Sequence, residues 1–404
     1  MSDIVIAGGG FAGLWAALSA QREIEEAAAD IRVTVISDDD HLTLRPRLYE
    51  AEPERFRVPL RPILDAVGVA FMAGRVSELD SAGSAVACGG DRGTVAYDRL
   101  ILATGSQLAP FPVPGAEAHA FDVDNWRAAM ALDAHLANLA TSPQPPGGDT
   151  VVVIGGGFTG IEIATEMRDR ITRHAGPARA AAARVVLLEQ ADVVGKELGD
   201  NPRPAIEAAL AEARVEIRLG AVVSAINGDG VSLSNGESIA AQTVVVAVGM
   251  RASPLTAELG VDCDPLGRLP VDEMLRVIGV PRVYATGDVA HATVDDDGNT
   301  ALMSCQHAMT MGRYAGYNAA RDLLGLTLEP YRQARYVTCL DLGRSGAVFT
   351  QGWSREVEIT GAEAKKMKRR INGEVIYPPT GDKAEILAAA TLVPAHHKAA
   401  PSAD

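Results

Sequence analysis

Two glycine-rich segments carry the residue types and spacing best suited to chemistry in this 404-residue chain. In each, a short apolar run leads to the pattern GxGxxG and then to a helix-like segment, as in DIVIAGGGFAG at 3–13 and TVVVIGGGFTG at 150–160. Such a turn lets the backbone approach a pyrophosphate, whose charge the start of the following helix stabilises. The two copies predict two dinucleotide sites. Their residues are Gly8, Gly10, Phe11, Ala12 and Gly13, and Gly155, Gly157, Phe158, Thr159 and Gly160.

A carboxylate at the end of the second strand of each unit is expected to bind the adenosine ribose. In the second unit the strand at 184–188 leads to Glu189, and no arginine follows directly to receive a 2′-phosphate, which favours NADH over NADPH. In the first unit the strand at 31–36 is followed by Ser37 and three aspartates, of which we choose Asp38. The register stays open by one residue, and a solvated acidic loop is the alternative.

The elements that must position these loops follow an α/β pattern. We predict strands at 4–7, 31–36, 150–154, 184–188, 243–249 and 281–288, and a long helix over 303–324. Residues 74–102 alternate like a β-meander that returns to the first sheet. A Pro/Gly linker is expected at 142–149, and residues from 326 onward form a smaller tail with a disordered end after 394.

Composition excludes several classes of protein. With 37 basic and 52 acidic residues the formal charge is −15, and 47% of residues are hydrophobic, so nucleic-acid binding and disorder are disfavoured. No run of 18 apolar residues occurs, and the first strand begins too near Met1 for a secretory signal, so we expect a cytoplasmic protein. The widely spaced Cys88, Cys263, Cys305 and Cys339 form no CxxC, which predicts neither a metal site nor a redox disulfide.

Further motifs follow the glycine loops in a fixed order: ATG at 103–105, AVGMR at 247–251 and YATGDVA at 284–290. In this order they resemble the two-dinucleotide-binding-domain flavoproteins, a pyridine nucleotide-disulfide oxidoreductase-like family, over about residues 1–325. The resemblance implies two Rossmann-like domains, with FAD on the first and NADH on the second, which is inserted in the first. The implied boundaries are 1–115 and 265–325 for the FAD domain, 116–264 for the NADH domain and 326–404 for a C-terminal domain.

The resemblance also assigns residues. It implies that Asp288 binds the ribityl or pyrophosphate region of FAD and that Val76 contacts the adenine through its backbone. The other residues it places at the cofactors are Ala103, Thr104, Gly105, Gly249 and Gly287.

Within that family the chain looks most like the type II NADH:quinone oxidoreductases. Glu162 continues the second glycine loop, Arg45 begins the segment RPRLYE, and Gln306 lies in SCQHA, which is similar to their quinone-site helix start. The resemblance therefore implies that Glu162 lies beside the nicotinamide, that Arg45 lies near the isoalloxazine, and that Gln306 contacts the acceptor. For Glu162 an exposed first-turn carboxylate is the alternative, and for Gln306 a purely structural hydrogen bond.

Departures from the pattern weaken the assignment of quinone. Thr310 replaces the second glutamine of that helix, Cys305 replaces its leading alanine, and Ser37 stands where an acidic residue is expected. His307 is expected to be a packed helix residue.

The predicted reaction is hydride transfer from the nicotinamide to FAD, followed by electron transfer to a quinone. The alternatives are a reductase of a soluble electron-carrier protein, a thiol or sulfide oxidant that uses Cys305 and Cys339, and a redox sensor that binds FAD and NADH. A basic segment, KKMKRR at 365–370, leaves open a weak peripheral membrane contact, although a solvated face is favoured. We expect a monomer or homodimer.

Overall fold

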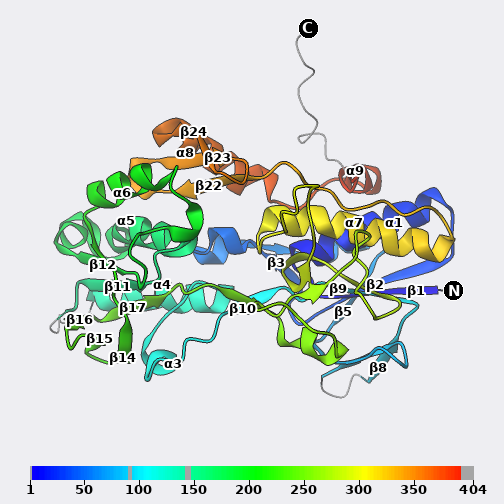
Figure 1. Ribbon diagram of the computed structural model, residues 1–404, viewed down its shortest axis with the longest axis horizontal. Helices are drawn as coiled ribbons and strands as arrows, with labels where there is room; N and C mark the ends of the chain where they lie inside the picture. Colours follow the sequence, from blue (N-terminus) through cyan, green and yellow to red (C-terminus); the bar gives the residue numbers. More distant parts are fainter. Residues whose placement is uncertain (1, 90–92, 142–146, 393–404) are drawn as a thin grey trace, which may run out of the picture.

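The computed structural model describes residues 2–89, 93–141 and 147–392, which form two sheet-centred lobes and a tail (Figure 1). Most of the predicted linker at 142–149 and the predicted disordered end after 394 lie outside the described residues. Among the described residues, no helix combines the length and hydrophobicity needed to cross a bilayer.

The first lobe is built on a parallel five-stranded sheet. Its strand order is β20-β9-β1-β2-β5, so β20, the last of these five strands in the sequence, lies beside β9, about 180 residues earlier. The bounds are β1 Ser2–Ala7, β2 Ile31–Ser37, β5 Ala70–Ala73, β9 Arg99–Leu102 and β20 Val283–Ala285. The central strands β1, β9 and β20 are apolar and mostly buried, as expected for a sheet covered on both faces, whereas the edge strand β5 is only partly buried.

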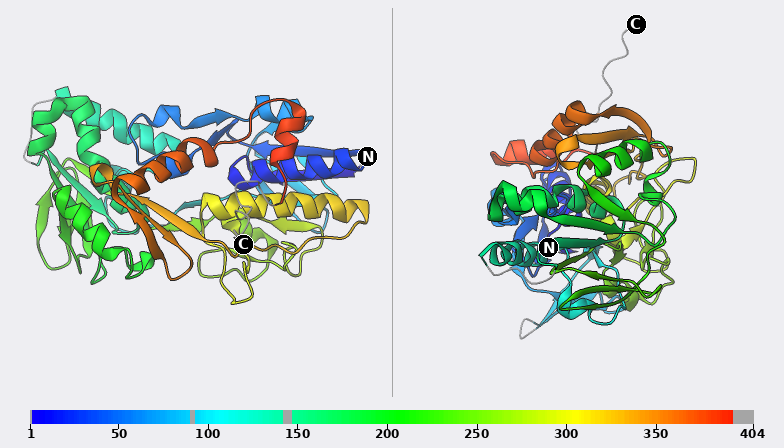
Figure 2. Two further views of the ribbon diagram at one scale, coloured as in Figure 1. Left: turned by 90° about the horizontal axis from the view of Figure 1, so that it is seen from above. Right: turned by 90° about the vertical axis from the view of Figure 1, so that its left-hand side faces the viewer.

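Two long helices, α1 Phe11–Glu26 and α7 Cys305–Leu324, run side by side along this lobe (Figure 2). They approach closely because both carry small residues at the contact: a Cβ on Gly312 would lie 2.4 Å from the Ala12 carbonyl oxygen, and one on Gly316 would lie 2.0 Å from that of Ala16. The helix predicted over 303–324 is therefore present and begins two residues later. The predicted meander is the antiparallel sheet of β6 Val76–Asp80, β7 Ala85–Cys88 and β8 Thr94–Ala96.

The second lobe holds a parallel four-stranded sheet in the order β13-β12-β11-β17. Its strands are β11 Thr150–Ile154, β12 Arg184–Leu188, β13 Val215–Arg218 and β17 Thr243–Val246. Its helices are α4 Trp126–Thr141, α5 Phe158–Ala182, which is broken at Gly176, and α6 Arg203–Glu212. A second meander contains β14 Val223–Asn227, β15 Gly230–Leu233 and β16 Ser238–Ala240.

The chain crosses between the lobes on one antiparallel pair, β10 Ser106–Leu108 and β18 Met250–Ala252. All strands of the second sheet fall between β9 and β20 in the sequence, so the second unit is inserted in the first. The predicted α/β class with two Rossmann-like units is confirmed. The shorter elements are β3 His41–Thr43, β4 Arg57–Pro59, α2 Arg61–Val67, α3 Ala116–His119, β19 Leu269–Pro270 and β21 Ala290–His291.

The tail reaches across both lobes (Figures 1 and 2). It begins as an antiparallel sheet of β22 Val337–Asp341, β23 Ala347–Gln351 and β24 Glu356–Thr360, beside α5 of the second lobe. It continues through α8 Gly361–Arg370 and a single π-helical turn at Ile371–Val375 to α9 Lys383–Ala389, which packs on α1 and α2 of the first lobe.

Candidate active site

One cavity of about 960 Å³ lies where the two lobes and the tail meet. Both glycine loops line it, from Gly8 to Ala12 on one side and from Gly157 to Thr159 on the other. The start of α7 and the tail complete its wall. The sequence could not show that both loops open into one space, because this depends on how the lobes are placed.

The first glycine loop has the shape that a bound dinucleotide requires. Gly8 has φ +113°, and a Cβ there would lie 2.3 Å from the Ala103 carbonyl oxygen. A Cβ on Gly13 would lie 1.9 Å from the Gly8 carbonyl oxygen, so helix and strand pack together only with glycine. A Cβ on Gly10 would meet no atom within 4 Å, so the space at the start of α1 is open. No side chain of the described residues caps this helix start, which leaves its N–H groups for an anion such as the pyrophosphate of FAD.

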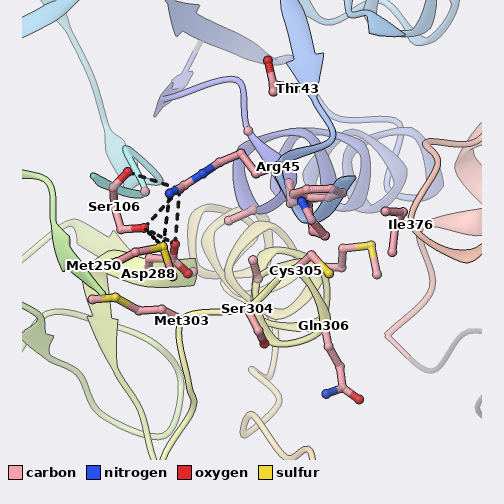
Figure 3. A pocket seen from close by; sticks show the side chains of 18 of the residues that line it. Thr43, Arg45, Ser106, Met250, Asp288, Met303, Ser304, Cys305, Gln306 and Ile376 are labelled. Carbon is pink, nitrogen blue, oxygen red and sulfur yellow. Dashed lines mark hydrogen bonds and ion pairs between the residues drawn. The ribbon is translucent and has the colours of Figure 1, made fainter. Parts of the chain in front are cut away.

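The residues expected over the flavin gather around Asp288 (Figure 3). The Ser106 hydroxyl donates to Asp288 Oδ2 at 2.6 Å, and burial raises the pKa of Asp288. Arg45 Nη1 lies 3.9 Å from the same carboxylate, and its Nη2 donates to Asp124 Oδ1 at 2.6 Å. Arg45 also donates to the Ser106 carbonyl oxygen, so this cluster ties the first lobe to the crossover strand β10. Neither Ser106 nor Asp124 was predicted from the sequence.

The other predicted FAD contacts also face the cavity. Ala103, Thr104, Gly105, Gly249 and Gly287 all line it. The Thr104 hydroxyl is buried with no partner among the described residues, so it is free to bond a ligand.

The aspartates that follow β2 have different surroundings. Asp38 is exposed and lines the cavity with Val76, as a ribose-binding carboxylate should. Asp39 is engaged by the Arg57 guanidinium and by the backbone N–H of His41. In the second unit Glu189 follows β12 as predicted, but it is not part of the cavity lining. Its carboxylate accepts from the N–H groups of Gly156 at 2.6 Å and Ala191 at 2.8 Å.

The second glycine loop repeats the first with one difference. Gly155 has φ +106°, and a Cβ on Gly160 would lie 1.8 Å from its carbonyl oxygen. Here Glu197, from the segment before α6, places Oε1 3.2 Å from the Phe158 nitrogen and accepts its N–H. A carboxylate therefore occupies part of the helix start that the NADH pyrophosphate would need. No sequence signal marked Glu197.

Glu162 is not the exposed carboxylate considered as its alternative: it is 3% exposed and lines the cavity. Its Oε1 accepts from Lys368 Nζ at 2.8 Å and from the Asp341 N–H at 3.0 Å, both in the tail. Lys368 Nζ also donates to the Cys339 carbonyl oxygen at 2.9 Å. Burial outweighs the attraction of Lys368 and raises the pKa of Glu162 to about 7. The pKa of Lys368 is raised by Glu162 despite burial, so the lysine stays protonated while Glu162 titrates near neutrality.

This pair changes the interpretation of the basic segment in the tail. Lys368 is buried against Glu162, and Lys365 turns inward to Asp341 and Glu166. Two of the five basic residues of KKMKRR are thus paired with carboxylates of the protein, which weakens the expectation of a membrane contact.

The start of α7 is held by its N-cap and by the tail. The Ser304 hydroxyl oxygen accepts the His307 N–H at 3.3 Å, and Gln306 Nε2 donates to the Val337 carbonyl oxygen at 3.2 Å. Gln306 lines the cavity, but its amide points away from Asp288 (Figure 3). The structure thus gives Gln306 the hydrogen bond of the structural alternative. His307 is fully buried beside Tyr336, as expected of a packed residue.

Cys263, Cys305 and Cys339 are free thiols within the described residues. Burial raises the pKa of Cys305 to about 11 and that of Cys339 to about 12, so neither is a thiolate at neutral pH. A thiol-based reaction is therefore disfavoured.

Comparison with known proteins agrees with this geometry. The family described as pyridine nucleotide-disulphide oxidoreductase matches residues 2–312. An NADH dehydrogenase-like protein of Mycobacterium tuberculosis is 45% identical over 394 residues, which cover 96% of this chain and 98% of that protein. A type II NADH:quinone oxidoreductase of Staphylococcus epidermidis is 26% identical over 93% of this chain and 95% of its own length. The solved structure of NDH2 from Plasmodium falciparum with NADH has the same fold, with TM-score 0.76, 15% identity and coverage of 93% and 95%.

The matched family spans both glycine loops and the start of α7, and the 45% identical relative extends the match through the tail. The predicted enzyme class and the predicted cofactors, FAD and NADH, are confirmed. The chain belongs to the pyridine nucleotide-disulphide oxidoreductase family and is an NADH oxidoreductase of that family.

Proposed function

We propose that this enzyme oxidises NADH and passes the electrons through FAD to a quinone. The observation that carries the proposal is the single cavity onto which both glycine loops open, and which continues between α7 and the tail. Met309, Val375 and Ile376 give that continuation the apolar lining that an aromatic acceptor needs. The Staphylococcus epidermidis relative, named as a quinone oxidoreductase, supports the same acceptor class.

The chain's own residues supply binding and orientation. Bound FAD supplies the redox chemistry, since it accepts a hydride from the nicotinamide and returns two electrons to the acceptor. The open start of α1 would hold the pyrophosphate of FAD, and Asp288 would accept from its ribityl hydroxyls. The loop at Gly157 to Thr159 brings NADH to the same cavity. Holding both reactants in one water-poor space is how the protein accelerates the transfer.

Proton balance gives Glu162 a role. Oxidation of one NADH by one quinone to a quinol consumes one proton beyond the hydride. Glu162 lines the cavity and titrates near neutrality, and its Oε1 is occupied by Lys368 and Asp341, so Oε2 is the atom that carries the proton. We infer that Glu162 holds this proton and that Lys368 keeps the carboxyl group in place.

The test is anaerobic stopped-flow reduction of the holoenzyme by NADH, followed by mixing with 1,4-naphthoquinone. Rapid bleaching of the flavin and rapid quinone-driven reoxidation are expected. Gly160→Ala is the control, because its Cβ would collide with the Gly155 carbonyl oxygen, and the variant should keep FAD but bleach slowly with NADH. Rapid bleaching with slow reoxidation by every quinone would reject the proposal and favour a carrier protein as acceptor. Slow turnover with all acceptors, together with an NADH-induced change in mass, would favour a sensor.

A further inference from the structure

A buried cation on α7 has no counter-ion among the described residues. Arg313 is 3% exposed, and its guanidinium carbon lies 3.6 Å from the centre of the Trp15 ring. Its Nη1 donates to the Met309 carbonyl oxygen at 3.1 Å, whereas Nε is buried without a partner in the described part of the chain. Arg313 lines the same cavity as the two glycine loops.

The other basic groups of this wall differ from Arg313. Arg45 has Asp124 at 2.6 Å and Lys368 has Glu162 at 2.8 Å, but no carboxylate of the residues that the structure describes lies within 4.0 Å of Arg313. Burial alone acts on this group and lowers the pKa of Arg313 to about 9, so it remains charged at neutral pH. The Trp15 ring offsets part of the cost of burying this charge, but a fully buried cation normally has an anionic partner.

Arg313 is on the face of α7 that lines the tail side of the cavity. Cys305, Met309 and Arg313 follow one another at intervals of four residues, so they lie on one face of α7, and all three line the cavity. Figure 3 shows Cys305 on the side of α7 that faces Ile376 of the tail. Arg313 lies eight residues into α7, and its guanidinium stacks on Trp15, four residues after α1 begins at Phe11. The cation therefore lies between α7 and α1, on the cavity-lining face of α7 that it shares with Cys305.

We propose that Arg313 binds an anionic group on the electron acceptor, so that the preferred acceptor is an aromatic quinone with a carboxylate or sulfonate substituent. The apolar residues beside it would contact the ring, and the guanidinium would pair with the acid group. Reduction of a sulfonated or carboxylated quinone rests on the proposed function, whereas binding of the acid group to Arg313 does not.

The experiment compares two acceptors, 1,4-naphthoquinone and 1,4-naphthoquinone-2-sulfonate, in steady-state assays with the holoenzyme. Arg313→Met removes the charge and keeps an unbranched apolar side chain, and Arg313→Lys restores a cation. Arg321→Met is the matched control, because Arg321 is on the same helix and lies 4.8 Å over the Tyr317 ring, but it is paired with Glu23 and is not part of the cavity lining.

In Arg313→Met, kcat/KM should fall about tenfold or more for the sulfonated quinone and stay within about twofold for the neutral one. Arg313→Lys should recover most of the loss, and Arg321→Met should leave the ratio between the two acceptors unchanged. An equal ratio in the wild type and in Arg313→Met would overturn the proposal and leave Arg313 as a structural partner of Trp15.

Binding is measured separately, so that the two proposals can fail independently. Naphthalene-2-sulfonate, which cannot be reduced, is titrated into the oxidised holoenzyme by calorimetry. Binding to the wild type but not to Arg313→Met supports the anion site even if no quinone is turned over, in which case only the proposed function falls. Absence of binding to the wild type, or equal binding to both proteins, would reject the anion site. FAD content and the unfolding temperature of each variant show whether the fold is intact.

Discussion

Replacing Glu162 by glutamine should change how the stability of the enzyme depends on pH. The ordinary pKa of a glutamate is 4.5, and in the folded protein burial raises the pKa of Glu162 to about 7. A carboxyl group whose pKa is raised by folding contributes stability that is fully present below pH 4.5 and is lost as the pH rises to 7. At about 1.4 kcal/mol per pH unit, this group costs the wild type about 3 kcal/mol of unfolding free energy over that range. A glutamine side chain cannot ionise, so the Glu162→Gln variant should not show this loss.

The assay is urea unfolding of the FAD-saturated proteins between about pH 4.5 and pH 8.5, followed by tryptophan fluorescence, a range that brackets the titration of Glu162. Groups far from Glu162 titrate equally in both proteins, so their effects cancel in the difference between the two unfolding free energies. That difference should move in favour of Glu162→Gln as the pH rises and become constant above about pH 7. A difference that moves the opposite way would refute the reasoning, because it would mean that Lys368 outweighs burial and holds the pKa of Glu162 below its ordinary value.

Three further predictions follow from the cavity. Glu197→Gln should lower the KM for NADH about two- to fivefold, because it removes a negative charge from the helix start where we expect the pyrophosphate to bind; an unchanged KM in steady-state assays would contradict this. Gly13→Ala should abolish FAD binding by disrupting the loop, whereas Gly10→Ala should weaken FAD binding and leave the unfolding temperature of the apoprotein unchanged; fluorescence titration and thermal unfolding distinguish the two. The double variant Cys305→Ser, Cys339→Ser should keep NADH oxidation within about twofold, because both thiols are protonated at neutral pH; a loss of turnover would revive the thiol mechanism.

Much of the fold could be predicted from local sequence. A strand, a glycine turn and a helix occupy adjacent residues, so the positions of β1, α1, β11 and α5 follow from short patterns, and the structure has them at nearly the predicted residues. The carboxylate after β12 was found for the same reason. Helix starts and strand ends depend on residues that are neighbours in the chain, so they are the features most easily predicted from a sequence.

The polar partners inside the site could not be predicted in this way. Lys368 is 206 residues from Glu162, and in the sequence it belongs to a run of basic residues that looks like an exposed surface. A lysine is rarely buried without a partner, and the partner of Lys368 is on another lobe. Periodicity therefore cannot show which lysine of that run turns inward. Glu197 and Ser106 could not be predicted for the same reason, since each forms its hydrogen bond with a residue that is distant in the chain.

The tail therefore does more than close the cavity. Without β22 and α8, Glu162 would lose Lys368 and the Asp341 N–H, and its carboxyl group would be in contact with water, with a pKa near its ordinary value. The tail thus sets the protonation of a residue on the second lobe, and its Val375 and Ile376 line the same cavity. Because one segment governs both, a change in the tail should alter proton supply and acceptor choice together, whereas the two glycine loops continue to bind their nucleotides.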